Sequence, residues 1–117
     1  MAEAPAPAAR LAALQRDYRA QLPQRLAAIE ESWSRLATGS WEAGPARELL
    51  RLVHNLTGSG ATFGVAELSA AAREFEQQLQ AAIGDRSPLS AEARARIQAA
   101  LAQVQGVVRR LTATAGS

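Results

Sequence analysis

The sequence contains no cysteine, no lysine and a single histidine, His54. The lack of cysteine excludes a disulfide scaffold and a zinc site with thiolate ligands. One histidine cannot supply the usual set of histidine ligands, so we expect no metal site within the chain. No Ser-His-Asp constellation is evident either. If any side chain performs reversible covalent chemistry near neutral pH, it is His54, because histidine alone normally titrates in that range.

Long apolar runs are also missing. No stretch approaches eighteen consecutive apolar residues, and the first nine residues lack the charged start and apolar core of a signal peptide. We therefore expect no association with a membrane and a soluble, cytoplasmic protein.

Blocks of like charge are absent as well. The thirteen cations are all arginine and are interspersed with eleven carboxylates, which leaves a net charge of +2. No run of five like charges forms a basic arm, and the few aromatic residues occupy apolar helical positions instead of alternating with arginine. We therefore expect no nucleic-acid partner.

What remains is a composition suited to helices. Of the 117 residues 48% are apolar, and alanine, leucine, arginine, glutamine and glutamate predominate. No alternating strand pattern occurs, so the fold class is all-α. The length fits one small domain. We predict a disordered lead-in over residues 1–9, a helical bundle over residues 10–112 and a frayed tail over residues 113–117.

The first predicted helix begins at Arg10 and has one apolar face over more than seven turns. Pro23 lies inside it and removes one backbone donor, so we expect a kink or a break near Leu22, giving a kinked first helix or an N-terminal helical extension. Its predicted buried residues are Leu11, Leu14, Tyr18, Leu22, Leu26, Ile29, Trp33 and Leu36. Trp33 is expected in the core, and Trp41 against the following loop.

Three further helices follow. We predict them over residues 45–62 and 65–83, joined by a turn at Gly64, and from Ser90, a good N-cap, to about Leu111. Loops are expected at residues 38–44 and 84–88. The short connections favour an up-and-down antiparallel four-helix bundle. Its later buried stripes comprise Leu49, Val53, Leu56 and Phe63; Leu68, Ala71, Ala72, Phe75, Leu79 and Ile83; and Ala93, Ile97, Leu101, Val104, Val108 and Leu111.

His54 lies beside the buried stripe of the second predicted helix. On its outer face Arg47, Arg51, His54, Gly58 and Ala61 are three or four residues apart and form one column, called the histidine column below. Glycine inside a helix costs about 1 kcal/mol relative to alanine. At Gly58 the missing side chain leaves space for another molecule to approach His54. Gly60 lies on the inward stripe, where close packing of helices is the better explanation.

Counting from the turn gives His54 a candidate partner. His54 is eleven residues before Val65 and Glu76 is eleven residues after it. In antiparallel helices both therefore lie roughly 16 Å from the turn. A carboxylate that accepts the Nδ1 proton would leave Nε2 as the free nucleophilic nitrogen. Glu76 could equally be an ordinary solvated helix residue, and spacing does not decide between the two.

The order of these residues resembles histidine phosphotransfer (HPt) domains of bacterial multistep phosphorelays. Their motif is His-x-Leu-Lys-Gly-Ser, a further glycine, and a leucine-rich helix that ends in Leu-Glu or Leu-Gln. The resemblance is strongest over residues 49–79 and rests on His54, Leu56, Gly58, Ser59, Gly64, Leu68, Phe75 and Glu76. The chain departs from the motif at Thr57, where the family usually has lysine.

The resemblance implies that His54 exchanges a phosphoryl group with receiver-domain aspartates and that Glu76 orients its imidazole. The partners would be a response-regulator receiver domain, a hybrid histidine kinase or both, with no small-molecule substrate. The chain would be a phosphotransfer intermediate more than a stand-alone catalyst. It would hold no cofactor, because the Mg²⁺ ion and the aspartate belong to the receiver.

The candidates for access and docking are Gly58, Ala61, Arg51 and Arg47 of the histidine column, together with Thr57 beside it. The arginines could supply the charge that the family lysine offers to phosphate, or could only aid solubility. Thr57 could bind a phosphoryl oxygen or, as we favour, its own helix carbonyl.

Two alternatives remain open. A pseudo-HPt adaptor would dock a receiver or mediate dimerisation without being phosphorylated. A pure scaffold bundle would use its glycines only for packing, and it predicts a buried imidazole.

Overall fold

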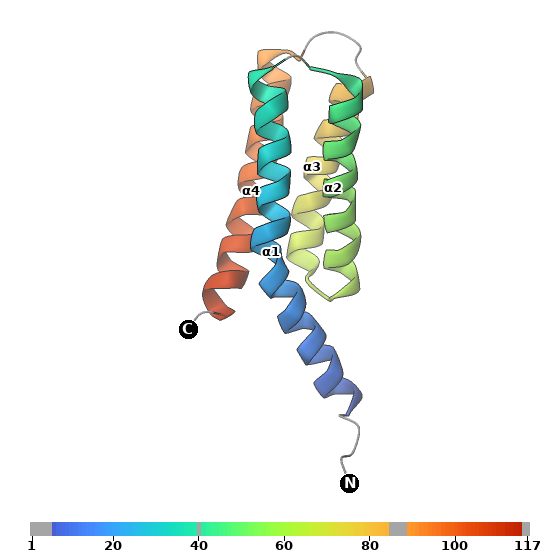
Figure 1. Ribbon diagram of the computed structural model, residues 1–117, viewed down its shortest axis with the longest axis vertical. Helices are drawn as coiled ribbons and strands as arrows, with labels where there is room; N and C mark the ends of the chain where they lie inside the picture. Colours follow the sequence, from blue (N-terminus) through green and yellow to red (C-terminus); the bar gives the residue numbers. More distant parts are fainter. Residues whose placement is uncertain (1–5, 40, 85–88, 116–117) are drawn as a thin grey trace.

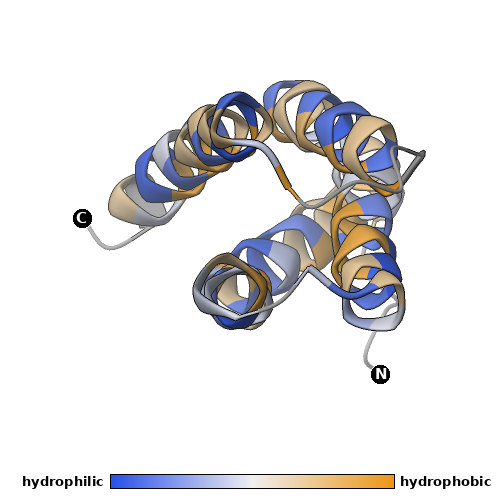
Figure 2. Cartoon of the chain, turned by 90° about the horizontal axis from the view of Figure 1, so that it is seen from above, coloured by the Kyte–Doolittle hydropathy of each residue, from blue (hydrophilic) through white to orange (hydrophobic). Residues whose placement is uncertain are grey.

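The computed structural model describes residues 6–39, 41–84 and 89–115. It forms four helices: α1 (Pro7–Thr38), α2 (Ala43–Thr62), α3 (Ala66–Gly84) and α4 (Ala91–Ala115). Each helix packs against its neighbours in the chain, and α4 packs back against α1, which closes the ring (Figure 1). Seen along the bundle, the four helices surround one interior (Figure 2). The predictions of an all-α chain and an up-and-down four-helix bundle are confirmed.

The first and last helices, α1 and α4, are longer than the sequence pattern predicted. α1 begins at Pro7, three residues before Arg10 and inside the predicted lead-in, because proline suits the first turn of a helix. α4 continues to Ala115, inside the predicted tail. Residues 1–5 of the predicted lead-in and residues 116–117 of the predicted tail lie outside the described residues.

Pro23 bends α1 without breaking it. The helix is continuous from Pro7 to Thr38 with Pro23 inside it, so of the kink or break that we expected, the break does not occur. Figure 1 shows the N-terminal part of α1 at an angle to the rest of the helix, directed away from α4 and below the turn between α2 and α3. The missing donor and the ring of Pro23 favour such a change of direction.

Most residues of the predicted stripes lie in the core or at its margin, and two are exposed. Leu11 and Leu14 are 49% and 52% exposed, so their predicted burial is wrong. Their apolar spacing continues that of Tyr18 and Leu22, but α1 extends past the turn between α2 and α3 (Figure 1), and the other described residues leave these two side chains about half exposed. The buried apolar residues are Tyr18, Leu22, Ile29, Trp33, Leu36, Ala46, Leu49, Val53, Leu56, Val65, Leu68, Ala72, Phe75, Leu79, Ala82, Ile97, Ala100, Leu101, Val104, Val107 and Val108.

Several predicted positions lie at the margin of this core. Trp33 is buried, as expected, whereas Trp41, which was expected to pack against a loop, is partly buried against the core. The other partly buried apolar residues of the predicted stripes are Leu26, Phe63, Ala71, Ile83, Ala93 and Leu111.

The turn between α2 and α3 is built on Gly64, as predicted. Gly64 has φ +74°, a conformation that favours glycine. The N–H of Val65 donates to the carbonyl of Gly60, and the N–H of Gly64 donates to that of Ala61. This pair of bonds is a Schellman motif. It reverses the chain within three residues and brings α3 back along α2.

The remaining connections are partly described. Ser90 caps α4, since its Oγ accepts a hydrogen bond from the N–H of Ala93 at 3.0 Å, as predicted. Residues 85–88 of the predicted second turn lie outside the described residues.

Polar contacts fix α1 against the end of α2. The Gln15 amide donates to the carbonyl of Phe63 at 2.9 Å, and the hydroxyls of Tyr18 and Ser59 share a hydrogen bond of 2.7 Å. The rings of Tyr18 and Phe63 stack with their centroids 4.6 Å apart. The exposed start of α1 is thereby held beside the turn that follows the helix of His54.

Candidate functional site

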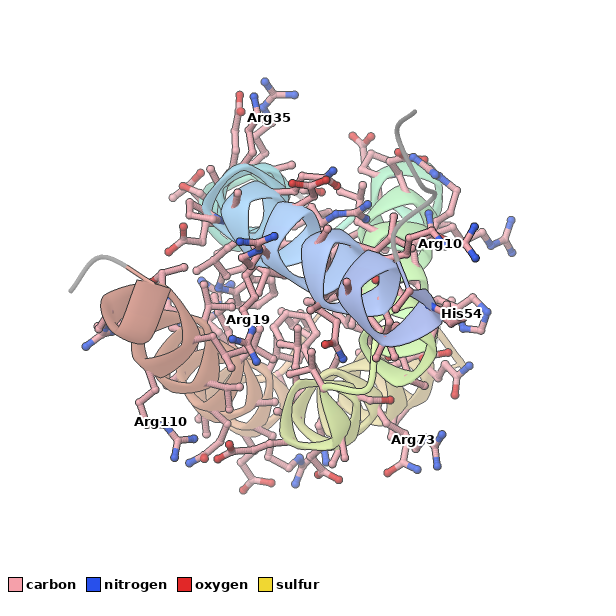
Figure 3. All side chains as sticks on the ribbon, turned by 90° about the horizontal axis from the view of Figure 1, so that it is seen from below. Arg10, Arg19, Arg35, His54, Arg73 and Arg110 are labelled. Carbon is pink, nitrogen blue, oxygen red and sulfur yellow. The ribbon has the colours of Figure 1, made fainter. Side chains whose placement is uncertain are left out.

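His54 stands on the outer face of α2. Its side chain is 68% exposed, and the imidazole points away from the bundle (Figure 3). The inward neighbour Val53 is buried, so the helix places the two residues on different faces, as their spacing predicted. A pure scaffold bundle predicts a buried imidazole, and that prediction is wrong.

Glu76 on α3 contacts the imidazole. The distance from His54 Nδ1 to Glu76 Oε2 is 2.7 Å. An ionised carboxylate only accepts hydrogen bonds, so Nδ1 is the donor, and in the neutral imidazole Nε2 then keeps its lone pair. The Glu76 side chain is only 14% exposed, so it holds the ring from behind. The reading of Glu76 as an ordinary solvated residue is therefore wrong.

Thr57 lies beneath this pair. It is buried, so its expected place on the access and docking surface is wrong. Its hydroxyl is 3.1 Å from the carbonyl of Val53, the contact that we favoured from sequence. The same hydroxyl is 3.2 Å from Glu76 Oε1 and can donate to it. In place of a charged lysine, the chain has a hydroxyl that supports the carboxylate.

Gly58 and Gly60 occupy opposite environments. A Cβ atom added at Gly60 would lie 3.1 Å from the backbone nitrogen of Ser69 on α3, so Gly60 lets the two helices approach closely. A Cβ atom added at Gly58 would meet nothing within 4 Å. Helix side chains lean towards the N-terminus, so a larger residue at 58 would extend over His54. Gly58 leaves that space open.

Ser69 belongs to the site, although sequence reasoning missed it. It is buried, and its Oγ donates to the carbonyl of Thr57 at 2.8 Å. The count from the turn that paired His54 with Glu76 could have found it, because Gly60 is five residues before Val65 and Ser69 is four after it. A small polar residue opposite a glycine is the signal.

Within the described part of the chain, no hydrogen bond joins the arginines of the histidine column to His54. Arg51 donates to Glu48 through Nε at 3.0 Å and through Nη2 at 2.5 Å. The hydrogen bond with Arg51 lowers the pKa of Glu48, and the bond with Glu48 raises the pKa of Arg51. Arg47 and Ala61 are exposed, and no hydrogen bond or ion pair of the Arg47 side chain joins it to the described residues.

Metal and membrane sites were searched for within the described ranges. No group of three or more histidine, cysteine, aspartate or glutamate side chains there could hold a metal ion. None of the described helices has the length and apolarity needed to span a bilayer.

The geometry therefore presents Nε2 of His54 as the candidate reactive atom of the site. Nε2 of His54 is exposed and carries a lone pair, while Glu76 can compensate a positive charge on the ring. An attacking group of this kind suits transfer of an electrophilic group delivered by a partner, because transfer then depends on positioning and charge.

Comparison with known proteins agrees with this geometry. A family model described as Hpt domain matches residues 13–107, a range that includes His54 and Glu76 and reaches into all four helices. Neither the comparison with curated proteins nor the comparison with solved structures gave a match.

Proposed function

The chain belongs to the Hpt domain family, which acts in phosphorelay signalling, and from this premise we propose that His54 accepts a phosphoryl group from a receiver-domain aspartate and passes it on. Members of the family interact with receiver domains and kinases in phosphorelays. The observation that carries the proposal is the exposed imidazole of His54, whose Nδ1 lies 2.7 Å from the carboxylate of Glu76.

The proposed step is an in-line displacement. Nε2 attacks the phosphorus of an aspartyl phosphate, the Nε2–P bond forms, the bond from phosphorus to the aspartyl oxygen breaks, and the aspartate leaves as a carboxylate. The ring keeps its Nδ1 proton and becomes positively charged, and Glu76 compensates that charge. Donation to a second receiver is the reverse of this step. The domain is thus an intermediate in phosphotransfer more than a catalyst.

The receiver supplies the remaining chemistry in this proposal. Its Mg²⁺ ion neutralises the phosphoryl oxygens, so the Hpt chain needs no cofactor of its own. The docking surface is the open face around Gly58 and Ala61, continued by the exposed start of α1 with Leu11 and Leu14. Exposed apolar side chains of this kind commonly mark protein interaction sites. The receiver, or a hybrid kinase that carries one, is the partner.

Replacing His54 by glutamine tests the proposal. His54→Gln should fold like the wild type, because the side chain is mostly exposed. Incubated with a phosphorylated receiver, the wild type should acquire an acid-labile, base-stable label at His54, and the variant should acquire none. Equal labelling of the two proteins would contradict the proposal.

A second candidate is a pseudo-Hpt adaptor that docks a receiver without being phosphorylated. The observation in its favour is Thr57, which brings no positive charge to the site and is buried. This candidate predicts that the wild type binds a receiver, measured by titration, and that it remains unlabelled. Binding together with labelling at His54 would exclude it.

A further inference from the structure

The cation nearest to His54 along the histidine column is engaged elsewhere. Arg51 is three residues before His54 and forms a two-point contact with Glu48. The Arg51 and Glu48 side chains are 57% and 54% exposed, so water competes with both bonds. A surface pair of this kind is weak and can exchange partners.

Helix geometry puts His54 and Arg51 within reach of each other. Residues three apart lie on one face of a helix, with their Cβ atoms about 5 to 6 Å apart. Side chains lean towards the helix N-terminus, so the imidazole of His54 leans towards the turn that carries Arg51. A group on the exposed Nε2 would then lie beside a guanidinium.

We infer that Arg51 exchanges Glu48 for the phosphoryl group when His54 is phosphorylated, and that Glu48 restrains this phosphorylation by holding Arg51. The inference rests on the proposed function. A phosphoryl group carries about two negative charges and three acceptor oxygens, and arginine binds it through two parallel hydrogen bonds. It is thus a stronger partner for Arg51 than the single charge of Glu48. Arg51 thereby supplies the charge that Thr57 lacks.

Two other cations serve as matched controls. Arg47 belongs to the same column but is seven residues, or about 10 Å, from His54. Arg73 is exposed on α3, three residues before Glu76, and points away from the bundle (Figure 3). Both carry the same charge as Arg51. Removing either one therefore tests whether the effect needs a contact between Arg51 and the phosphoryl group, or only positive charge on the surface.

The test uses phosphoramidate as donor, so that no receiver is needed. Its P–N bond breaks, ammonia leaves, and the Nε2–P bond of phosphohistidine forms while Nδ1 keeps its proton. The measurements are the initial rate of phosphorylation and the ¹⁵N–¹H signal of Arg51 Nε. We expect this signal to shift on phosphorylation. Arg51→Gln should lower the rate about three- to tenfold, as a cation about 6 Å from a dianion in water predicts.

Further variants separate the contact from its alternatives. Arg51→Lys should restore most of the rate, and Glu48→Gln should raise it about two- to threefold. In the Arg51→Gln background, Glu48→Gln should have no effect, because Glu48 acts through Arg51. Arg47→Gln and Arg73→Gln should remain within twofold of the wild type. Salt should diminish the effect of Arg51→Gln.

Each other outcome overturns the inference. Normal labelling of Arg51→Gln at the wild-type rate would overturn it and leave the proposed function intact. If Glu48→Gln raised the phosphorylation rate equally in the wild type and in Arg51→Gln, Glu48 would act only through its own negative charge and not through Arg51. A large loss in Arg73→Gln would assign the cation to α3. A wild type that phosphoramidate does not label at His54 would overturn both the inference and the proposed function.

Discussion

The inner and outer faces of α2 differ most clearly at two glycines that are two residues apart. At Gly60 an added Cβ would press on the backbone of Ser69, whereas at Gly58 it would meet open space. The helix accepts a similar propensity cost of about 1 kcal/mol at each position. On the inner face Gly60 allows close packing of α2 on α3. On the outer face Gly58 leaves His54 accessible.

The two faces are connected through Glu76. From the inner side Ser69 binds the carbonyl of Thr57, and the Thr57 hydroxyl reaches Glu76 Oε1. On the outer side Glu76 Oε2 binds Nδ1 of His54. The packed face thus holds the imidazole from behind while its Nε2 faces solvent. This difference between the faces can be tested by changing them one at a time.

The largest expected effect is on stability, at the inner face. Gly60→Leu should lower the free energy of unfolding by about 3 kcal/mol, because even a Cβ atom would lie 3.1 Å from the backbone of Ser69. Urea denaturation measures this loss. The matched control is Gly58→Leu, which should keep the wild-type stability within about 1 kcal/mol. Equal losses in both variants would remove the difference between the faces.

A smaller effect is expected where the two faces meet. Glu76→Ala should slow phosphorylation of His54 about 10- to 100-fold, the range typical for loss of a partner that orients a histidine. The initial rate with phosphoramidate measures it. Glu74→Ala is the control on the same helix, because Glu74 is exposed and its side chain binds only Gln78 among the described residues. An unchanged rate in Glu76→Ala would mean that the packed face of α2 does not affect phosphorylation of His54 through Glu76.

A third prediction concerns the hydrogen bond that spans α2 and α3. Ser69→Ala should cost about 1 kcal/mol of stability, because a buried bond to the Thr57 carbonyl is lost. Thr62→Ala removes an exposed bond to the carbonyl of its own helix at Gly58 and should cost less than about 0.5 kcal/mol. Thermal unfolding of the two variants compares them. A larger loss in Thr62→Ala would contradict the assignment of Ser69 to the packed face.

The sequence predicted the helices and the common level of His54 and Glu76, because both depend on regular spacing, whereas spacing left open whether the two side chains touch. A turn at Gly64 fixes the level of each residue on α3 relative to α2, and counting then gives that level. The contact between the two side chains is seen only in the structure. The choice between the faces for Gly58 and Gly60 followed from the same periodicity.

Other features depend on where neighbouring helices end, which periodicity does not contain. Leu11 and Leu14 continue the apolar stripe of α1, yet they remain exposed near the end of α1 that extends past the turn of α2 and α3. The contacts of Thr57 with Glu76 and of Arg51 with Glu48 are choices among rotamers, which residue spacing does not fix.

The smallest effect tests both faces with a single methyl group. Gly58→Ala should raise the free energy of unfolding by about 0.5 to 1 kcal/mol, because alanine favours the helix and its Cβ meets open space. Phosphorylation by phosphoramidate should be unchanged, since this donor is small. Transfer from a phosphorylated receiver should be about two- to fivefold slower, because the receiver must approach the backbone at residue 58. Urea denaturation and the two transfer rates together decide the matter: a destabilised variant would mean that Gly58 packs like Gly60, and unchanged transfer from the receiver would mean that its loops do not approach this glycine.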